Sequence, residues 1–173
     1  QGRLTLSPML NEKGKVIGDF TVGKLADEQF FIFGSGAGEA YHMRWFEAHL
    51  PEDGSVTIKA HGLGLVGLTI AGPKAREVLA KLTDADVSHD AFKFLDFKKM
   101  ELGMVPAMVG RVSFTRDLGY ELWVKPEFHP RLFDDILTIG ADYGIKLFGS
   151  RAMRSMSLEK GFGSWATEYR PIY

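Results

Sequence analysis

The sequence contains no cysteine among its 173 residues. This absence excludes disulfide bonds, cysteine nucleophiles, zinc sites with thiolate ligands and iron–sulfur clusters held by the chain. It is compatible with a reducing compartment, and we expect a cytoplasmic protein. The five histidines are scattered without a His-x-x-x-His pair, so they form no metal-ligand pattern and we expect no metal site. They are His42, His49, His61, His89 and His129.

The sequence also lacks a long apolar run and an excess of one charge. No stretch approaches the roughly 20 apolar residues that span a bilayer, and no signal-peptide pattern opens the chain. The 21 basic and 22 acidic residues nearly cancel. The strong field of one sign that is typical of nucleic-acid or anionic-membrane binding is therefore missing, and a small-molecule partner is favoured.

Both ends of the sequence resemble interior positions of a longer chain. It starts at Gln1, reaches the strand-like Leu4-Thr5-Leu6 within a few residues, and stops at Arg170-Pro171-Ile172-Tyr173. We therefore expect a fragment of a larger protein. Its length and its 45% hydrophobic content are enough for one core, or for two small cores that share a face.

The first 34 residues are rich in apolar and β-branched side chains, and they predict an antiparallel meander of three strands. Its first turn, residues 11–14, is a typical hairpin sequence because Gly14 accepts a positive φ. The strands are expected at residues 4–9, 16–25 and 29–33. Further strands are expected at residues 55–60, 65–71, 104–113 and 119–124, whereas residues 84–103 show no clean period.

Apolar residues at helical spacing predict four helices along the rest of the chain. They cover residues 38–50, 74–82, a part of 127–143, and 150–161. We expect Ser150 to cap the last of these helices at its N-terminus.

The order strand, helix, strand, strand, helix, strand between residues 29 and 124 indicates a split-βαβ (ferredoxin-like) unit. In such a unit the helices cover one face of an antiparallel sheet, so we predict an α+β fold with antiparallel sheets. Residues 1–28 are expected in a first subdomain and residues 29–143 in a middle one. Residues 144–173 are expected to form a helix and tail that return to the first subdomain.

Asp19 lies inside an apolar, β-branched run, where a carboxylate is costly unless it is paired or reaches solvent. Such an aspartate commonly caps a turn or accepts hydrogen bonds from backbone amides. The functional alternative is a carboxylate held beside a cationic or proton-transferring ligand.

Glu121 and Trp123 are expected on one face of a strand, with Phe114 across the preceding turn. A carboxylate beside aromatic rings can seat a flat heteroaromatic ring and accept hydrogen bonds from its N–H groups. The alternative is a solvent-exposed face that carries one surface glutamate.

Arg151, Arg154 and Ser155 share one face of the last predicted helix. Such a face can bind a carboxylate. The alternative is a salt-bridged helix surface on which Glu159 pairs with a neighbouring base. The glycine-rich residues 34–38 lack the Lys-Ser/Thr ending of a phosphate-binding loop, and we interpret them as a tight turn from strand to helix.

Taken in this order, the stretches around Asp19, around Glu121 and at residues 150–165 resemble the folate-binding aminomethyltransferase family. That family includes the T-protein of the glycine cleavage system and the C-terminal parts of dimethylglycine and sarcosine dehydrogenases and oxidases. The resemblance extends from Asn11 to Trp165. The Ser-Leu-Glu-Lys-Gly-Phe-x-x-Trp sequence at residues 157–165 is more similar to the dehydrogenase and oxidase branch.

The resemblance implies roles for individual residues. It assigns Asp19 to positioning or proton transfer beside the reacting nitrogens of tetrahydrofolate, and Glu121 to binding of the pteridine. Phe114 stands where T-proteins carry a tyrosine near the ring. Further folate contacts are implied for Ser35, Leu6, Arg151, Arg154 and Trp165.

Departures from the T-protein pattern concern the tail of the folate. T-proteins have an asparagine at the place of Ser35, and arginines near Met153 and Ser157. Because these groups are missing here, Arg151 or Arg154 has to supply the contacts to the tail.

The implied architecture is a three-domain ring around a central folate pocket, with any flavin in a separate domain. The implied activity is one-carbon transfer to tetrahydrofolate from an N-methyl amine such as dimethylglycine or sarcosine. Two alternatives stay open, a folate-dependent demethylase of a sulfonium compound and a non-catalytic folate-binding module. Modules with a Lys-Gly-Cys-x-x-Gly-Gln motif are disfavoured because Lys160-Gly161-Phe162 has no cysteine.

Overall fold

The computed structural model describes residues 1–169, and the C-terminal residues 170–173 lie outside the described part. The strands are β1 (Arg3–Leu10), β2 (Val16–Ala26), β3 (Gln29–Phe33), β4 (Val66–Ala71), β5 (Phe97–Leu102), β6 (Val105–Gly110) and β7 (Gly119–Val124). The helices are α1 (Glu39–Ala48), α2 (Ala75–Leu82), α3 (His129–Gly140) and α4 (Ser150–Glu159). None of these helices has the length and apolar character that crossing a membrane requires.

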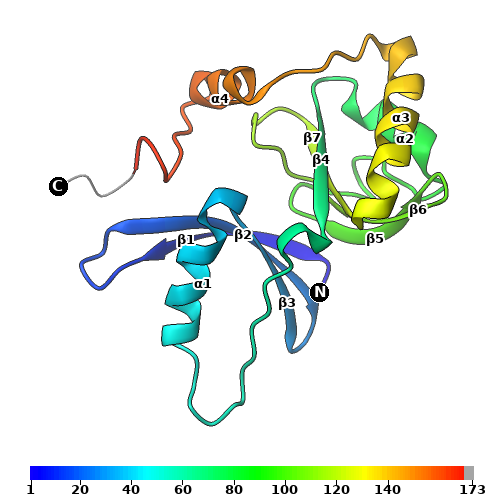
Figure 1. Ribbon diagram of the computed structural model, residues 1–173. Helices are drawn as coiled ribbons and strands as arrows, with labels where there is room; N and C mark the ends of the chain where they lie inside the picture. The colour runs from blue at the N-terminus through cyan, green and yellow to red at the C-terminus, as the bar shows by residue number, and fades with distance from the viewer. Residues whose placement is uncertain (170–173) are drawn as a thin grey trace.

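The first sheet is the predicted meander, in the order β1-β2-β3, with antiparallel pairing throughout. Helix α1 covers one of its faces (Figure 1). Phe20 of β2 makes that contact, with ring centroids 4.8 Å from His42 and 5.5 Å from Phe46. His42 is buried, and its Nε2 lies 3.0 Å from the carbonyl oxygen of Ile17. The opposite face of this sheet is free of α1.

The second sheet has the order β4-β7-β6-β5, and its pairings are all antiparallel. Helices α2 and α3 pack on one face, over a core that includes Leu79, Leu122 and Leu132, each fully buried. Alternation along β7 places Tyr120, Leu122 and Val124 in this core. The predicted α+β class with antiparallel sheets and helices on one face is thus confirmed.

Three details of the prediction are wrong, and one strand, β5, was not predicted. Strand β3 pairs with β2, so residues 29–33 belong to the first sheet, and the four-stranded unit starts at β4. Residues 55–60 form no strand, and β5 lies in the stretch without a clear period. The cap position of α4 is Gly149 and not Ser150, and no side chain caps it. The assignments of residues 29–33 and 55–60 were wrong because short extended runs look alike in sequence whichever sheet they join.

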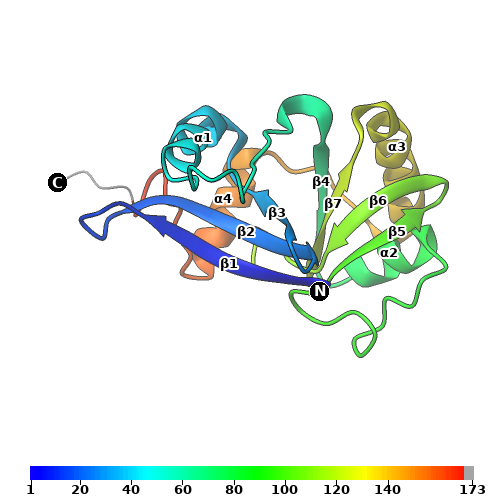
Figure 2. The ribbon, with the colours of Figure 1, turned by 90° about the horizontal axis from the view of Figure 1, so that it is seen from below.

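The two sheets meet through aromatic side chains. Phe33 of β3 stacks on Trp123 of β7 with ring centroids 3.8 Å apart, and Phe97 of β5 contacts both rings edge-on. Gly110 permits this approach, because a Cβ there would lie 2.8 Å from Leu4 Cδ1. Figure 2 shows the sheets side by side, with the start of β1 next to β5.

The C-terminal segment closes a ring with the two sheets (Figure 1). Helix α4 follows the second sheet, and the residues after it contact both parts of the fold. Lys160 forms an ion pair with Asp117 at 3.1 Å, in the loop between β6 and β7. Trp165 packs against His42 of α1, with ring centroids 4.9 Å apart.

Candidate functional site

The face of the first sheet that is free of α1 carries Asp19. Residues directly opposite in antiparallel strands share a face, and so do alternate residues of one strand. Asp19 is opposite Pro8, Thr21 is opposite Leu6 and Phe33, and Gly23 is opposite Leu4. The Gly23 end of this face packs on Phe97 of the second sheet. The Asp19 end is open, since Asp19 is exposed and Leu6 is 40% exposed.

The face of the second sheet opposite α2 and α3 carries Glu121. Glu121 and Trp123 are alternate residues of β7, and Glu121 is opposite Thr69 on β4 and Gly110 on β6. Trp123 stacks on Phe33, so this face and the Asp19 face meet at the Phe33–Trp123 contact. Glu121 lies two residues, roughly 7 Å, beyond Trp123 along its strand.

Asp19 lies at a similar remove from this contact along its own strand. It lies two residues along β2 from Thr21, which is paired with Phe33. Two carboxylates that are 102 positions apart in the sequence are therefore carried on two sheet faces that meet at one aromatic contact.

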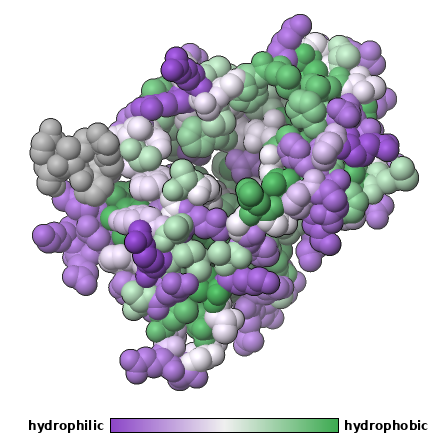
Figure 3. All heavy atoms as spheres, viewed as in Figure 1, coloured by the Kyte–Doolittle hydropathy of each residue, from purple (hydrophilic) through white to green (hydrophobic). Residues whose placement is uncertain are grey.

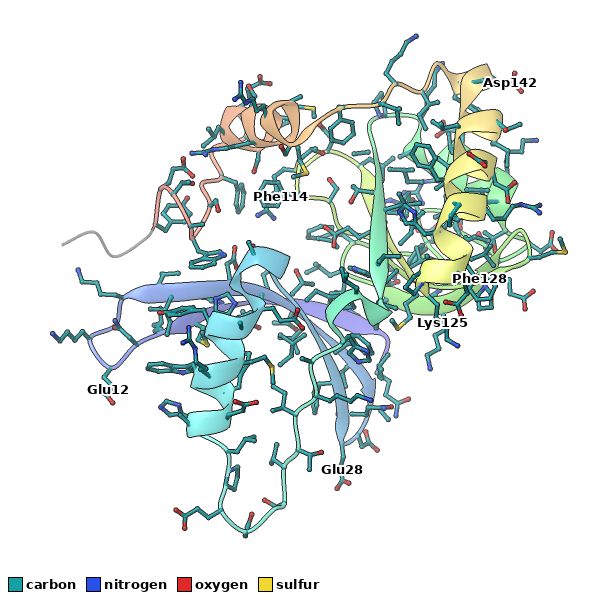
Figure 4. The ribbon with its side chains drawn as sticks, viewed as in Figure 1. Glu12, Glu28, Phe114, Lys125, Phe128 and Asp142 are labelled. Carbon is teal, nitrogen blue, oxygen red and sulfur yellow. The ribbon has the colours of Figure 1, made fainter. Side chains whose placement is uncertain are left out.

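The surface of the molecule is hollowed below α4. Figure 3 shows a recess in the middle of the face that Figure 1 presents, below α4 and above the β1–β2 strands. We call this recess the hollow. Phe114, 37% exposed, lies on its α4 side (Figure 4). The loop between β6 and β7 thus contributes an exposed aromatic ring, that of Phe114, beside the hollow.

Glu121 has an unusual electrostatic environment. Burial raises the pKa of its carboxyl group from the ordinary 4.5 to about 7, and the charge of Arg116 opposes this rise. Both the acid and the carboxylate forms are therefore populated near neutral pH. A group in this state can accept hydrogen bonds from ligand N–H groups, and a cationic ligand would favour its charged form.

The loop between β6 and β7 is held by buried hydroxyl groups. Ser113 Oγ donates to the carbonyl oxygen of Asp117 at 3.0 Å and lies 3.1 Å from Thr115 Oγ1. Both Ser113 and Thr115 are buried, which leaves Phe114 between them as the exposed member. The backbone of the loop therefore directs Phe114 outward.

Sequence reasoning missed Arg116 in this loop. Its guanidinium lies 3.8 Å from the ring centroid of Phe162, and it is the cation that acts on Glu121. There was little reason in the sequence to single out Arg116, because it stands in a polar turn, where a basic side chain is ordinarily exposed to solvent.

The other predicted folate-binding residues are only partly brought together. Ser35 is exposed, two residues after Phe33, at the turn that enters α1. Arg154 forms an ion pair with Glu168 at 2.6 Å and not with Glu159. Arg151 is exposed on the same helix. Trp165 is half-buried against α1.

These positions bear on the two alternatives for the last helix, a salt-bridged surface and a folate-binding face. The salt-bridged alternative for the α4 surface is supported at Arg154, because Arg154 forms an ion pair with Glu168, in the segment after α4. A role in folate binding for Ser35, Arg151, Arg154 and Trp165 stays a prediction. Within residues 1–169 no group of three or more histidine or acidic side chains is arranged to hold a metal ion.

Known proteins resemble this chain in sequence and fold. It is 38% identical to human mitochondrial dimethylglycine dehydrogenase over 170 residues, which cover 96% of this chain and 19% of that protein. It is 30% identical to the aminomethyltransferase of Chloroherpeton thalassium over 167 residues, covering 96% of this chain and 45% of that protein. The chain therefore spans about a fifth of the mitochondrial dehydrogenase and under half of the transferase.

The fold agrees with this relationship. The solved structure of the glycine cleavage system aminomethyltransferase T from Bartonella henselae superposes with a TM-score of 0.76 at 20% identity, over 94% of this chain and 42% of that chain. The sequence model named "GCVT N-terminal domain" matches residues 1–173. The chain therefore belongs to the GCVT N-terminal domain family.

Proposed function

We propose that this chain is a tetrahydrofolate-binding, one-carbon transfer domain of an enzyme that demethylates an N-methylated glycine. The observation that carries the proposal is that Asp19 and Glu121 lie on the two sheet faces that meet at the Phe33–Trp123 contact. The identity with dimethylglycine dehydrogenase supports the N-methylglycine donor over a sulfonium compound. The oxidation of the donor, and any flavin that it needs, would belong to other parts of the parent protein.

The residues of the hollow fit a reduced pterin. Such a ring offers several N–H donors along one edge and two flat apolar faces. Glu121 supplies an acceptor whose pKa lies close to neutral, so it can be held as a carboxylate when N–H donors replace the water it has lost. Phe114 and Leu6 supply exposed apolar surface beside it.

Asp19 has a different position and therefore a different role. It is exposed, at the open end of its sheet face, whereas Glu121 is largely buried on the other sheet. Bound tetrahydrofolate supplies ring nitrogens that accept a one-carbon unit. If Glu121 fixes the pterin, Asp19 can orient the reacting edge and hold a proton on a carboxylate oxygen during transfer.

The scaffold makes this arrangement available before binding. Both carboxylates are carried by strands, and the strands belong to sheets that already pack together through Phe33 and Trp123. Holding two reacting groups in fixed geometry removes a large part of an entropic barrier, roughly 7 to 11 kcal/mol in the best intramolecular cases.

The test is folate binding by the parent protein and its Glu121→Ala variant, measured by titration calorimetry. Loss of a charge-assisted hydrogen bond should weaken binding by about 1.5 to 3 kcal/mol. The matched control is Glu77→Ala, an exposed glutamate on α2, on the other face of the same sheet. Equal affinity of the Glu121→Ala variant and the parent would mean that the pterin binds elsewhere.

A further inference from the structure

The segment that follows the second sheet packs weakly on the rest of the fold. Among residues 144–169, which include helix α4, only Ser157 is buried. Helix α2, by contrast, buries Val78, Leu79 and Leu82 in the core of the second sheet. Because hydrophobic burial supplies most of the stabilisation of a packed helix, α4 and the residues after it belong to the least stable part of the fold.

The same segment is tied to itself. The Ser157 carbonyl accepts a hydrogen bond from the Phe162 amide at 3.1 Å, and the Ser157 hydroxyl donates to the Phe162 carbonyl at 3.3 Å. Arg154 of α4 forms an ion pair with Glu168 at 2.6 Å. Helix α4 and residues 160–169 therefore hold together as one unit.

An exposed linker joins this unit to the second sheet. Ile145, just before the linker, packs on the core of that sheet. Residues 146–149 are all exposed and form no helix or strand. A Cβ at Gly149 would meet nothing within 4 Å beyond its chain neighbours. The linker can therefore change its backbone angles without breaking contacts in the core.

Two contacts join the unit to the loop between β6 and β7. The Arg116 guanidinium lies 3.8 Å from the centroid of the Phe162 ring, and Lys160 forms an ion pair with Asp117 at 3.1 Å. Phe162 is 44% exposed, and the side chains of the ion pair are 48% and 37% exposed. Because water and salt screen exposed contacts of this kind, both are weak and can break together.

A third contact, to the first sheet, is better shielded. Trp165 is half-buried and packs against the buried His42 of α1, with ring centroids 4.9 Å apart. Gly38 permits this approach, because a Cβ there would lie 3.2 Å from Cζ2 of Trp165. The Trp165 contact is therefore the firm end of the unit, and the contacts to the loop between β6 and β7 are the ones that break first.

The hollow lies below α4, and Phe114 of the loop between β6 and β7 lies on its α4 side (Figures 3 and 4). We propose that residues 150–169 are a strap over this hollow. The strap is anchored at Trp165, and it opens for a ligand when Phe162 and Lys160 leave the loop. This inference rests on the proposed function, because it describes how the ligand of the same site enters and leaves.

Two variants of the parent protein weaken the contacts to the loop. Phe162→Ala removes the ring beneath the Arg116 guanidinium, and Asp117→Asn removes the charge that binds Lys160. The matched control is Leu158→Ala, because Leu158 lies on α4 and is 44% exposed, as Phe162 is.

A third variant locks the strap. The chain has no cysteine of its own, so a pair introduced as Asp117→Cys and Lys160→Cys can be bridged by a short bismaleimide. The bridge holds the unit on the loop and should act in the opposite direction to the two weakening variants.

The first measurement is hydrogen exchange of residues 150–169 in ligand-free parent protein. Phe162→Ala and Asp117→Asn should each raise exchange there about two- to fivefold, the factor for the loss of one weak exposed contact, and leave β6 and β7 unchanged. Leu158→Ala should behave like the parent. Unchanged exchange of residues 150–169 in both loop variants would overturn the proposal.

The second measurement is the rate of binding and release of 5-formyltetrahydrofolate, a chemically stable folate, by stopped flow. Because the loop contacts form with and without ligand, Phe162→Ala and Asp117→Asn should raise both rates about two- to fivefold and change affinity little. The bridged variant should lower both rates at least about tenfold. Unchanged rates, or a faster release alone, would overturn the proposal, since the latter would make Phe162 a ligand contact.

The two measurements separate this proposal from the function beneath it. If the parent protein does not bind the folate, the proposed function fails, and hydrogen exchange still decides whether residues 150–169 open at the loop. If the parent binds the folate and neither exchange nor rates respond to the variants, only the strap fails.

Discussion

Phe33 of β3 stacks on Trp123 of β7 with ring centroids 3.8 Å apart and an angle of 18° between the rings. This contact joins the sheet that carries Asp19 to the sheet that carries Glu121. The separation of the two carboxylates therefore depends on an aromatic pair that belongs to neither of them. Damage to this pair should affect both stability and the geometry of the hollow.

Phe33→Ala should lower the free energy of unfolding by about 2 to 3 kcal/mol, since a half-buried ring loses its partners Trp123 and Phe97. Urea denaturation monitored by circular dichroism measures the change. Phe30→Ala is the matched control, because Phe30 lies on the same strand and is 55% exposed. That control should change stability by less than about 0.5 kcal/mol. Equal losses in both variants would mean that the stacked pair does not hold the sheets together.

Glu121→Gln should stabilise the protein at alkaline pH. The pKa of the folded carboxyl group, about 7, lies above the ordinary 4.5, so the folded state retains a proton that the unfolded state has lost between these values. The charged glutamate thus costs stability progressively from pH 4.5 to 7 and fully above that range. The gain from glutamine should be about 1 to 3 kcal/mol at pH 8 and absent near pH 4. Thermal unfolding at both pH values checks it, and a gain of the same size at both would contradict the raised pKa.

Asp19→Asn in the parent protein should change folate affinity by less than about threefold while it cuts one-carbon transfer at least about a hundredfold, the usual contribution of a group that moves protons. Single-turnover transfer and equilibrium binding are measured on the same preparation. Asp27→Asn, an exposed aspartate in the turn between β2 and β3, is the control. Transfer at the rate of the parent would remove Asp19 from the mechanism.

Acid should loosen the segment after α4. Hydrogen bonds from the Thr167 hydroxyl, the Ser164 amide and the Arg154 guanidinium lower the pKa of Glu168 to about 2. A lowered pKa means that this stabilisation is present above the ordinary value of 4.5 and is lost as the pH falls towards 2.

The measurement for this segment is hydrogen exchange of residues 160–169. Glu168→Gln should increase exchange there at pH 7 and remove most of its acid dependence below pH 4.5. Arg151→Ala, on the exposed surface of α4, should leave the exchange as it is in the parent. Protection that does not respond to Glu168→Gln would show that this carboxylate does not anchor the segment.

Much of the fold follows from short-range pattern. The meander, α1, α2, α3, α4 and the strand that holds Glu121 were predicted within a few residues, because backbone geometry repeats every 2 or 3.6 residues and apolar side chains follow it. Residues 29–33 were predicted both as the third strand of the meander and as the start of the middle unit, and the pattern could not choose between the two. Their sequence of apolar and aromatic residues suits either sheet, and the choice depends on which strand edge is free beside them.

The sequence by itself determined the residue types of the site and their faces. Alternation sets Glu121 beside Trp123, and Asp19 is one of few charges in an apolar strand. Only the tertiary structure decided that these two faces meet, and that Arg116 and Phe162 lie together near Glu121. The physical reason is that periodicity fixes the direction of a side chain relative to its own strand, whereas the partner across a hollow depends on how distant segments pack.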